Sequence, residues 1–285
     1  MTLPLLPLAL GLGSAVTLAG ANTFVKASSD IVGARSVTSI SGAVIMAPFA
    51  FVTPLPNVAT WEVLAFALPA HWLYQTALVR ALSRGDLSLV FPVMRGSAPL
   101  LTALVAGLVL HEHLSMLALC GLAIASLATI VFAIPQKAAS QPMDLHKSAM
   151  FWAAATGVTV AIYNVVDAKG TRVAPEPFSF TVWLFLLDWI GINTVTALTR
   201  GRAYVRMLKA NFRYGFGAGA LSVLSFSAAL YGFSIAPVAY ISALRETAVI
   251  FGALLGWFLL KEGFGVRRTL AALLLACGLI VLQFG

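Results

Sequence analysis

Residues 237–262, PVAYISALRETAVIFGALLGWFLLKE, decide the fold class, because they are apolar enough for lipid and yet contain Arg245 and Glu246. A charged side chain in the hydrocarbon region of a membrane is costly, so it normally faces a cavity or a partner. A related pattern occurs 150 positions earlier, with Arg95 in place of Arg245 and LVLHEHL in place of FLLKEGF. The sequence therefore predicts a duplicated unit with an arginine inside each copy.

The composition indicates an all-α membrane protein. Of the 285 residues, 60% are hydrophobic and only 10% are charged, whereas a soluble domain carries about a quarter charged residues. The apolar residues come in blocks of about 20, which is the length of a helix that crosses a ~30 Å hydrocarbon core. A transmembrane β-barrel would need alternating strands of about ten residues, and the sequence shows no such alternation.

Several other classes are disfavoured. The net charge of +8 would suit nucleic acid only on a continuous soluble face, but the basic residues lie in short loops. Cys120 and Cys277 each lie in an apolar run, and residues 111–113, HEH, do not have metal-ligand spacing on a helix. We therefore expect no metal and no cofactor. The first 20 residues lack the basic start of a signal peptide, so we expect them to remain as a helix.

Ten spans are expected, in two halves of five. Proline-containing breaks occur at 53–57 and 174–177. The polar stretch 136–147 separates a first five-helix repeat, residues 1–140, from a second, residues 141–285. The expected spans are 4–25, 32–53, 60–82, 87–110, 114–134, 149–168, 178–198, 214–235, 237–260 and 265–284.

The basic residues predict the topology. The loops at the ends of spans 1, 3, 5, 7 and 9 hold fourteen of the eighteen Lys and Arg residues. Positive charge marks the cytoplasmic side, so both termini are predicted outside. Because five is odd, two successive five-span units cross the membrane in opposite directions. An inverted repeat of this kind allows alternating access to a midplane site.

Short motifs stand out in both halves: the segment ends His111-Glu112 and Lys261-Glu262, the prolines Pro92 and Pro99, and the glycines Gly121 and Gly278. In these motifs the sequence resembles the drug/metabolite transporter superfamily, in particular its EamA-type ten-helix members. Among those members it is most similar to the bacterial aromatic amino acid exporters, in its aromatic residues and His71 in the third expected span.

The resemblance implies a secondary transporter rather than an enzyme, placed as a multi-pass protein in the bacterial cytoplasmic (inner) membrane. It implies export of neutral or aromatic amino acids by alternating access. A multidrug or other metabolite carrier and a non-transporting membrane subunit are the alternatives. The expected partners are a small-molecule substrate and the lipid bilayer, without nucleic acid, and an internally duplicated chain can work as a monomer.

Arg95 and Arg245 are the leading candidates for substrate binding or gating. We expect Arg95 about 12 Å in from the cytoplasmic side and Arg245 about as far in from the outer side. Such a pair would suit two gates, or would bind a substrate carboxylate. The alternative is a structural role, such as an ion pair between Arg245 and Asp188 or the capping of backbone carbonyls.

Glu246 and Asp188 are candidates for coupling to a proton or cation, with structural pairing as the alternative. The remaining candidates for the substrate site are polar or aromatic residues within the spans. Interhelical hydrogen bonds and an interfacial aromatic belt are their alternative roles. These candidates are Asn22, His71, Tyr74, Tyr163, Asn164, Trp183 and Tyr240.

Overall fold

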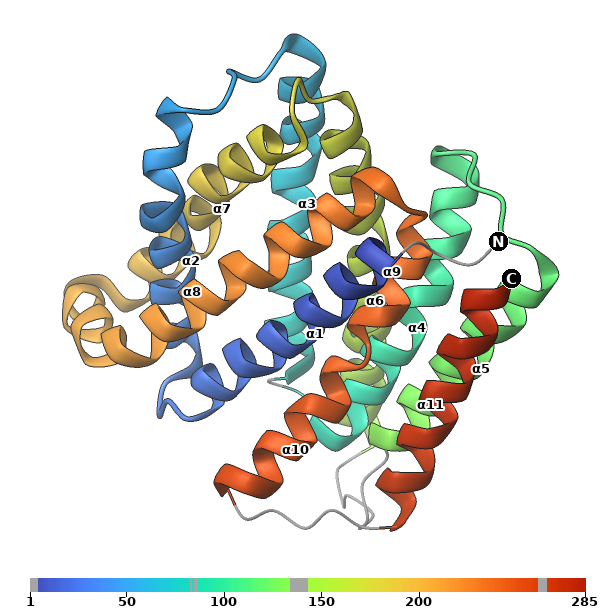
Figure 1. Ribbon diagram of the computed structural model, residues 1–285. Coiled ribbons are helices and arrows are strands. Elements are labelled where there is room, and N and C mark those ends of the chain that lie inside the picture. The colour runs from blue at the N-terminus through green and yellow to red at the C-terminus, as the bar shows by residue number, and fades with distance from the viewer. Residues whose placement is uncertain (1–4, 83, 85–86, 134–142, 261–265) are drawn as a thin grey trace.

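The computed structural model describes residues 5–82, 84, 87–133, 143–260 and 266–285, and within these ranges the regular structure is helical throughout. The helices, shown in Figure 1, are α1 Leu5–Lys26, α2 Ile31–Met46, η1 Ala47–Phe51, α3 Val58–Leu82, α4 Leu87–Val109, α5 Met116–Ala133, α6 Met143–Val173, α7 Pro177–Arg200, η2 Gly201–Ala203, α8 Tyr204–Ile235, α9 Val238–Arg245, α10 Ala248–Leu260 and α11 Val266–Phe284. Glu262 and the basic residues Lys137 and Lys261 lie outside the described ranges.

The helices confirm the prediction of an all-α fold, and their apolar lengths are consistent with a membrane protein. Four segments are long and apolar enough to cross a membrane: Leu5–Lys26, Ile31–Phe51, Lys147–Val173 and Pro177–Ile235, the last containing both α7 and α8. Three shorter apolar helical segments, Met94–Val109, Met116–Val131 and Thr269–Phe284, accompany them among the described residues. The count of ten spans and the repeat remain predictions.

The ends of the helices follow from local sequence. The two proline-containing breaks fall where the sequence predicts them, between η1 and α3 and between α6 and α7. Pro177 is the first residue of α7, a position where its missing N–H costs nothing. Asp30 caps α2 by accepting a hydrogen bond from the backbone N–H of Gly33 at 3.1 Å.

Helices that are distant in sequence pack side by side. α1 lies along α8, α3 lies along α6, and α4 also packs on α6. α5 and α11 pack on each other at one edge of the molecule, on the right of Figure 1, where α5 also packs on α4. The first part of the chain is thus interleaved with the second, and neither forms a compact unit alone.

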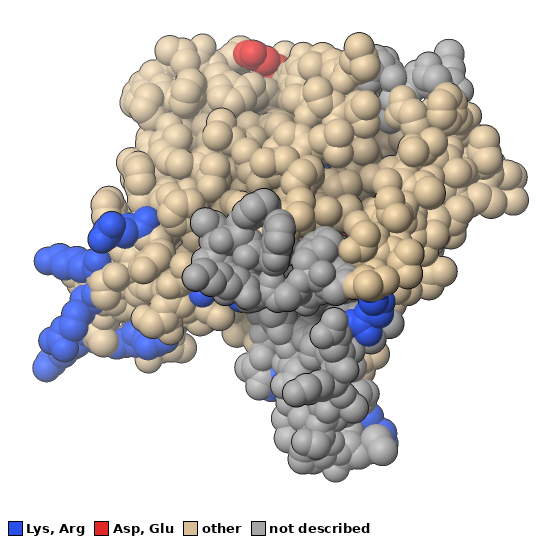
Figure 2. Space-filling model, turned by 60° about the horizontal axis from the view of Figure 1, so that its bottom comes forward, with Lys and Arg blue, Asp and Glu red and all other residues tan. Residues whose placement is uncertain are grey.

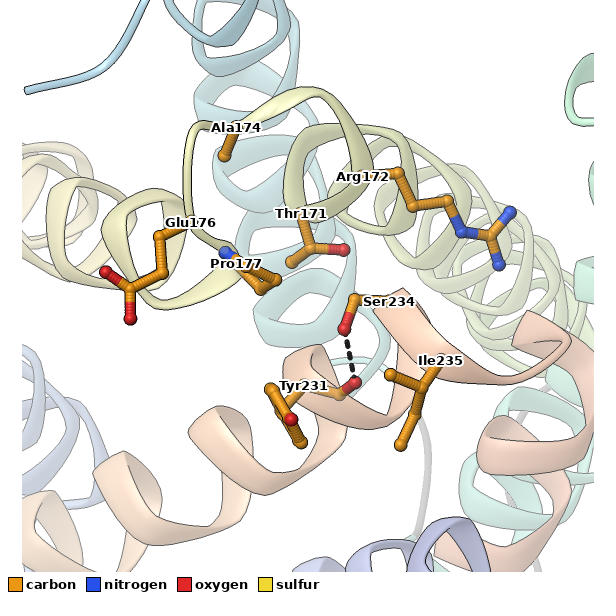
Figure 3. Close-up of a pocket in the computed structure, with 8 residues that line it drawn as sticks. All are labelled: Thr171, Arg172, Ala174, Glu176, Pro177, Tyr231, Ser234 and Ile235. Carbon is orange, nitrogen blue, oxygen red and sulfur yellow. Dashed lines mark hydrogen bonds between the residues drawn. The ribbon is translucent and has the colours of Figure 1, made fainter. Parts of the chain in front are cut away.

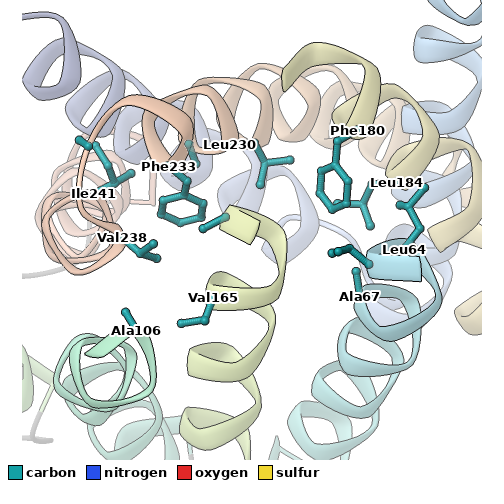
Figure 4. Close-up of a cluster of buried hydrophobic side chains, with 14 residues drawn as sticks. Leu64, Ala67, Ala106, Val165, Phe180, Leu184, Leu230, Phe233, Val238 and Ile241 are labelled. Carbon is teal, nitrogen blue, oxygen red and sulfur yellow. The ribbon is translucent and has the colours of Figure 1, made fainter. Parts of the chain in front are cut away.

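The largest apolar cluster lies where six helices meet (Figure 4). Leu64 from α3, Val165 from α6, Phe180 from α7, Phe233 from α8 and Ile241 from α9 are buried together in it. α4 adds Ala106. The cluster fixes α9 against the other helices, and α9 leads directly into the candidate site.

Charge is distributed unevenly over the surface. Figure 2 shows Lys and Arg side chains gathered toward one end of the molecule and an acidic group at the other end. Arg200, Arg202, Arg206 and Lys209, all exposed, lie around η2 at the junction of α7 and α8. This asymmetry is what a positive-inside orientation requires.

Candidate functional site

The apolar segment that contains Arg245 and Glu246 is divided into two helices. We expected one continuous helix over 237–260, but α9 ends at Arg245 and α10 begins at Ala248. Around the break, the N–H of Glu246 bonds the carbonyl of Ala243 at 3.0 Å, and the N–H of Thr247 bonds that of Leu244 at 3.1 Å. The hydroxyl of Thr247 also donates to the Leu244 carbonyl at 2.6 Å. These i to i+3 bonds tighten the chain into turns at the point where the two charged residues lie.

The two charged residues at the break reach different partners. Glu246 does not pair with its neighbour; its Oε1 lies 3.5 Å from a terminal nitrogen of Arg95 on α4. The Glu246 side chain is 4% exposed and that of Arg95 is 20% exposed. This ion pair connects the first part of the chain to the helix break in the second part.

Arg245 has a different environment. Its guanidinium carbon lies 5.1 Å from the centre of the Phe226 ring on α8, within the range of a cation–π interaction. The residue is 7% exposed, and its Nε is buried without a hydrogen-bond partner in the described structure. Asp188, the alternative ion-pair partner, instead accepts from the amide of Gln75, at 3.3 Å and 3.5 Å.

Two acceptors near the break are also buried without a partner among the described residues. They are Oε2 of Glu246 and Oδ1 of Asn164 on α6. The amide nitrogen of Asn164 points toward the hydroxyls of Thr102 at 3.3 Å and Ser242 at 3.4 Å. Ser242 lies one turn before Arg245 and Glu246, so these polar groups share one region. Buried polar groups are almost always hydrogen-bonded, and unpaired ones call for an explanation.

Tyr163 is the centre of an aromatic wall beside these polar groups. His71 stacks on it at 4.5 Å between ring centres, and Tyr74 meets it edge to face at 5.2 Å. Phe226 lies 6.3 Å away. His71 in turn places Nε2 3.0 Å from a carboxylate oxygen of Asp167. The wall therefore combines flat apolar surfaces with a buried acid–base pair.

The structure brings together most of the candidates from the sequence, but not all. Asn22 is exposed on α1. Trp183 packs edge to face on Trp61, at 5.0 Å, and lies against the largest apolar cluster. Tyr240 is buried in an apolar cluster with residues of α5 and α11. These three are separate from the aromatic wall, because each points from its helix toward a different neighbour.

Several residues of the site were missed by the sequence reasoning. Asp167, in the sixth expected span, was not among the candidates, although a carboxylate in an apolar span is itself a signal of function. Phe226, Ser242 and Thr102 gave no signal, because such residues are common in membrane helices. Only the folded arrangement assigns them to the site.

A hollow of about 480 Å³ opens on the surface at the junction of α6, α7 and α8 (Figure 3). Its lining residues are Thr171, Arg172, Ala174, Glu176, Pro177, Tyr231, Ser234 and Ile235. The hydroxyl of Ser234 donates to the backbone carbonyl of Tyr231 at 2.7 Å, shown by the dashed line. The hollow lies near the surface and away from the aromatic wall.

Beside this hollow, an ion pair connects three elements. Arg172 at the end of α6 binds Oε1 of Glu112 at 2.6 Å and the carbonyls of Phe233 and Ala236 at 3.0 Å and 3.1 Å. The other oxygen of Glu112 accepts from the N–H of Val238, at the start of α9, at 2.9 Å. Glu112 therefore has structural partners at the end of α6 and at the start of α9.

Comparison with known proteins gives a family for the second part of the chain. Residues 147–284 match the model of the EamA-like transporter family. No curated protein matches the chain at a significant level. A protein of known crystal structure is similar over 98% of this chain and 97% of its own, with a TM-score of 0.78 and 14% sequence identity. At that identity, the likeness shows a shared fold alone.

The family match, the apolar helices and the buried charges at a broken helix are consistent with one another. Residues 147–284 are similar to the EamA-like transporter family, which agrees with the resemblance to the drug/metabolite transporter superfamily predicted from the sequence.

Proposed function

We propose that the protein is a secondary transporter that exports neutral or aromatic amino acids by alternating access. The family domain indicates a membrane transporter of small molecules. The observation that supports the substrate class is the set of unpaired buried groups beside the aromatic wall: Nε of Arg245, Oε2 of Glu246 and Oδ1 of Asn164. The set offers one cationic donor and two acceptors within a largely apolar surrounding.

An α-amino acid complements this set. Its carboxylate would bind the guanidinium of Arg245, which is a strong charge-assisted contact. Its ammonium group would donate to Glu246 and Asn164, whose free oxygens accept. A flat or apolar side chain would lie against Tyr163 and Phe226, where aromatic rings favour offset stacking or edge-to-face contact. A ligand with only one charge would leave part of the set unpaired.

Alternating access would come from the two inverted halves, residues 1–140 and 141–285. If the second five spans are equivalent to the first five, the pair α1 with α8 corresponds to the pair α6 with α3. Both pairs pack closely. The proposed site receives Arg95 and Tyr74 from one half and Arg245 and Tyr163 from the other. A rocking motion of one half against the other would expose it to each side in turn.

The proposed setting is the bacterial cytoplasmic membrane with both termini outside. The basic side chains at one end of the molecule support this orientation (Figure 2). Export as the direction of transport rests on the resemblance described from the sequence. The duplicated chain supplies both halves of the site, so a monomer suffices.

Flux through reconstituted liposomes tests the proposal. Labelled phenylalanine and leucine should cross liposomes that contain the protein and should not cross empty ones. Arg245→Ala should lower the initial rate by about ten- to a hundredfold, because a hydrogen bond to a charged group contributes about 1.5–3 kcal/mol. Arg202→Ala, at an exposed position of η2, is the matched control and should leave the rate unchanged.

Three results would contradict the proposal in different ways. If Arg245→Ala transports at the wild-type rate, Arg245 does not bind the carboxylate of the substrate. Flux of cationic drugs without flux of amino acids would favour a multidrug carrier. No flux of any solute through well-folded protein would favour a non-transporting subunit.

A further inference from the structure

His71 on α3 and Asp167 on α6 form a buried acid–base pair next to the proposed amino acid site. Nε2 of His71 lies 3.0 Å from one carboxylate oxygen of Asp167 and 3.2 Å from the other. The side chains are 8% and 0% exposed. Neither residue is needed for the contacts proposed for an amino acid, so the pair requires its own explanation.

Other titratable and charged groups face this pair from the helices around it. Asp188 on α7 accepts from Gln75, which lies one turn after His71 on the same helix. Arg245 at the end of α9 is close enough to His71 for a charge–charge interaction, and so is Asp188. Tyr163 stacks on the imidazole, and Tyr74 meets Tyr163 edge to face. On α4, Arg95 is occupied by Glu246.

The chemistry of the pair suits a proton that is bound and released. Imidazole is the side chain whose ordinary titration lies in the physiological range. With a proton on the imidazole, His71 and Asp167 together carry no net charge. Without it, the pair carries one negative charge, close to the carboxylate of Asp188. In an interior of low dielectric constant, this difference of one charge acts strongly on neighbouring groups.

Two aromatic rings connect the pair to the proposed amino acid site. Phe226 lies 5.7 Å from the ring of His71 and 5.1 Å from the guanidinium of Arg245. Tyr163 contacts His71 and lies next to Asn164 in the chain. A change in the charge of His71 therefore acts on Arg245 electrostatically. A change in its position acts on Arg245 through the aromatic rings that pack between them.

We infer that His71 and Asp167 bind the proton whose movement drives amino acid transport. The inference rests on the proposed transport function. A proton from water on one side of the membrane adds to the imidazole nitrogen, forming one N–H bond. The same bond breaks when the site is exposed to the other side, and the proton returns to water. The pair is thus the coupling site, and Arg245 with Glu246 and Asn164 is the amino acid site.

Liposomes that separate exchange from driven transport test the inference. Wild-type protein is reconstituted with phenylalanine on both sides to measure exchange, and with a gradient of one pH unit to measure accumulation. If one proton is coupled, accumulation approaches tenfold, the concentration ratio that corresponds to about 1.4 kcal/mol. In Asp167→Asn and in His71→Gln, exchange should continue at a lower rate while accumulation falls to that measured without a pH gradient. His113→Gln, an exposed histidine, should behave as the wild type.

The outcomes distinguish the two proposals. Wild-type protein that exchanges no amino acid contradicts the transport function itself. Exchange without any response to the pH gradient, or full accumulation in both variants, overturns only the proton site. If the variants do not fold, wild-type protein in weakly buffered detergent decides the question. Addition of phenylalanine should change the number of protons bound to the protein near pH 7. If phenylalanine causes no uptake or release of protons at any pH from 5 to 9, the inference is overturned.

Discussion

At the scale of residues, the ion pair between Arg95 and Glu246 allows a direct prediction about stability. Arg95→Ala leaves the carboxylate of Glu246 buried without its cation, and loss of one partner from a buried pair costs about 3–5 kcal/mol. Arg95→Ala should therefore lower the midpoint of thermal unfolding in detergent. Glu246→Gln added to Arg95→Ala should restore most of the loss, because the amide needs no countercharge.

The double variant is the decisive measurement for this pair. If Arg95→Ala with Glu246→Gln is no more stable than Arg95→Ala alone, the distance of 3.5 Å between the two groups does not reflect an energetic interaction. Arg206→Ala, on the exposed start of α8, provides the control for removal of an arginine as such.

The sequence identifies charged residues of the site but not their partners. Arg95, Arg245 and Glu246 are visible because a charge in an apolar span is rare. That Glu246 pairs with Arg95 depends on where α4 crosses the end of α9, which no local pattern encodes. The same limit explains Trp183 and Tyr240. Their residue types suited an aromatic wall, but the rotation of each helix placed them elsewhere.

At the scale of helices, the crossing of α5 and α11 depends on two glycines. A Cβ at Gly278 would lie 2.6 Å from the backbone nitrogen of Ala125 and 2.9 Å from the carbonyl oxygen of Gly121. Gly278→Ala should force the helices apart and cost about 1–3 kcal/mol, as overpacking generally does. Thermal unfolding in detergent measures it. Gly13→Ala on α1, where a Cβ would meet nothing within 4 Å, should be neutral or stabilising.

The opposite result would be informative for this crossing. If Gly278→Ala unfolds at the temperature of the wild type, α5 and α11 do not approach as closely as their backbone atoms indicate. The resemblance to EamA-type proteins singled out Gly121 and Gly278 without saying what they do. The packing supplies the reason, since small residues at a membrane helix crossing let the backbones meet.

The sequence predicts the helices where a long apolar run forms them and where prolines mark their ends. The breaks near Pro54 and Pro175 are strong signals, and both are present in the structure. The break after Arg245 has neither proline nor glycine. It depends on the bond from Thr247 to the Leu244 carbonyl and on the burial of the two charges, so a hydropathy pattern could not reveal it.

At the scale of the whole molecule, the ion pair of Glu112 with Arg172 connects the two proposed halves at one face. Glu112 comes from the loop between α4 and α5, and Arg172 lies near the end of α6. Glu112 also accepts from the start of α9. If the halves rock against each other, this face opens only when these bonds break. The pair should therefore hold the face closed.

Thiol labelling in the membrane tests this role. Ser242→Cys, introduced after Cys120→Ala and Cys277→Ala, places a thiol at a buried position of α9. Glu112→Gln should raise its rate of reaction with a membrane-impermeant reagent applied from that face by about tenfold, because the lost charge-assisted bond contributes about 1.5–3 kcal/mol to the closed state. Glu176→Gln removes an exposed carboxylate from the hollow that Arg172 also lines (Figure 3), and it should leave the rate unchanged. Equal rates in Glu112→Gln and in its parent would mean that the pair stabilises the fold without controlling access. If Glu112→Gln instead speeds labelling by reagent applied from the opposite side of the membrane, loss of the pair opens the other face, and the proposed role is wrong.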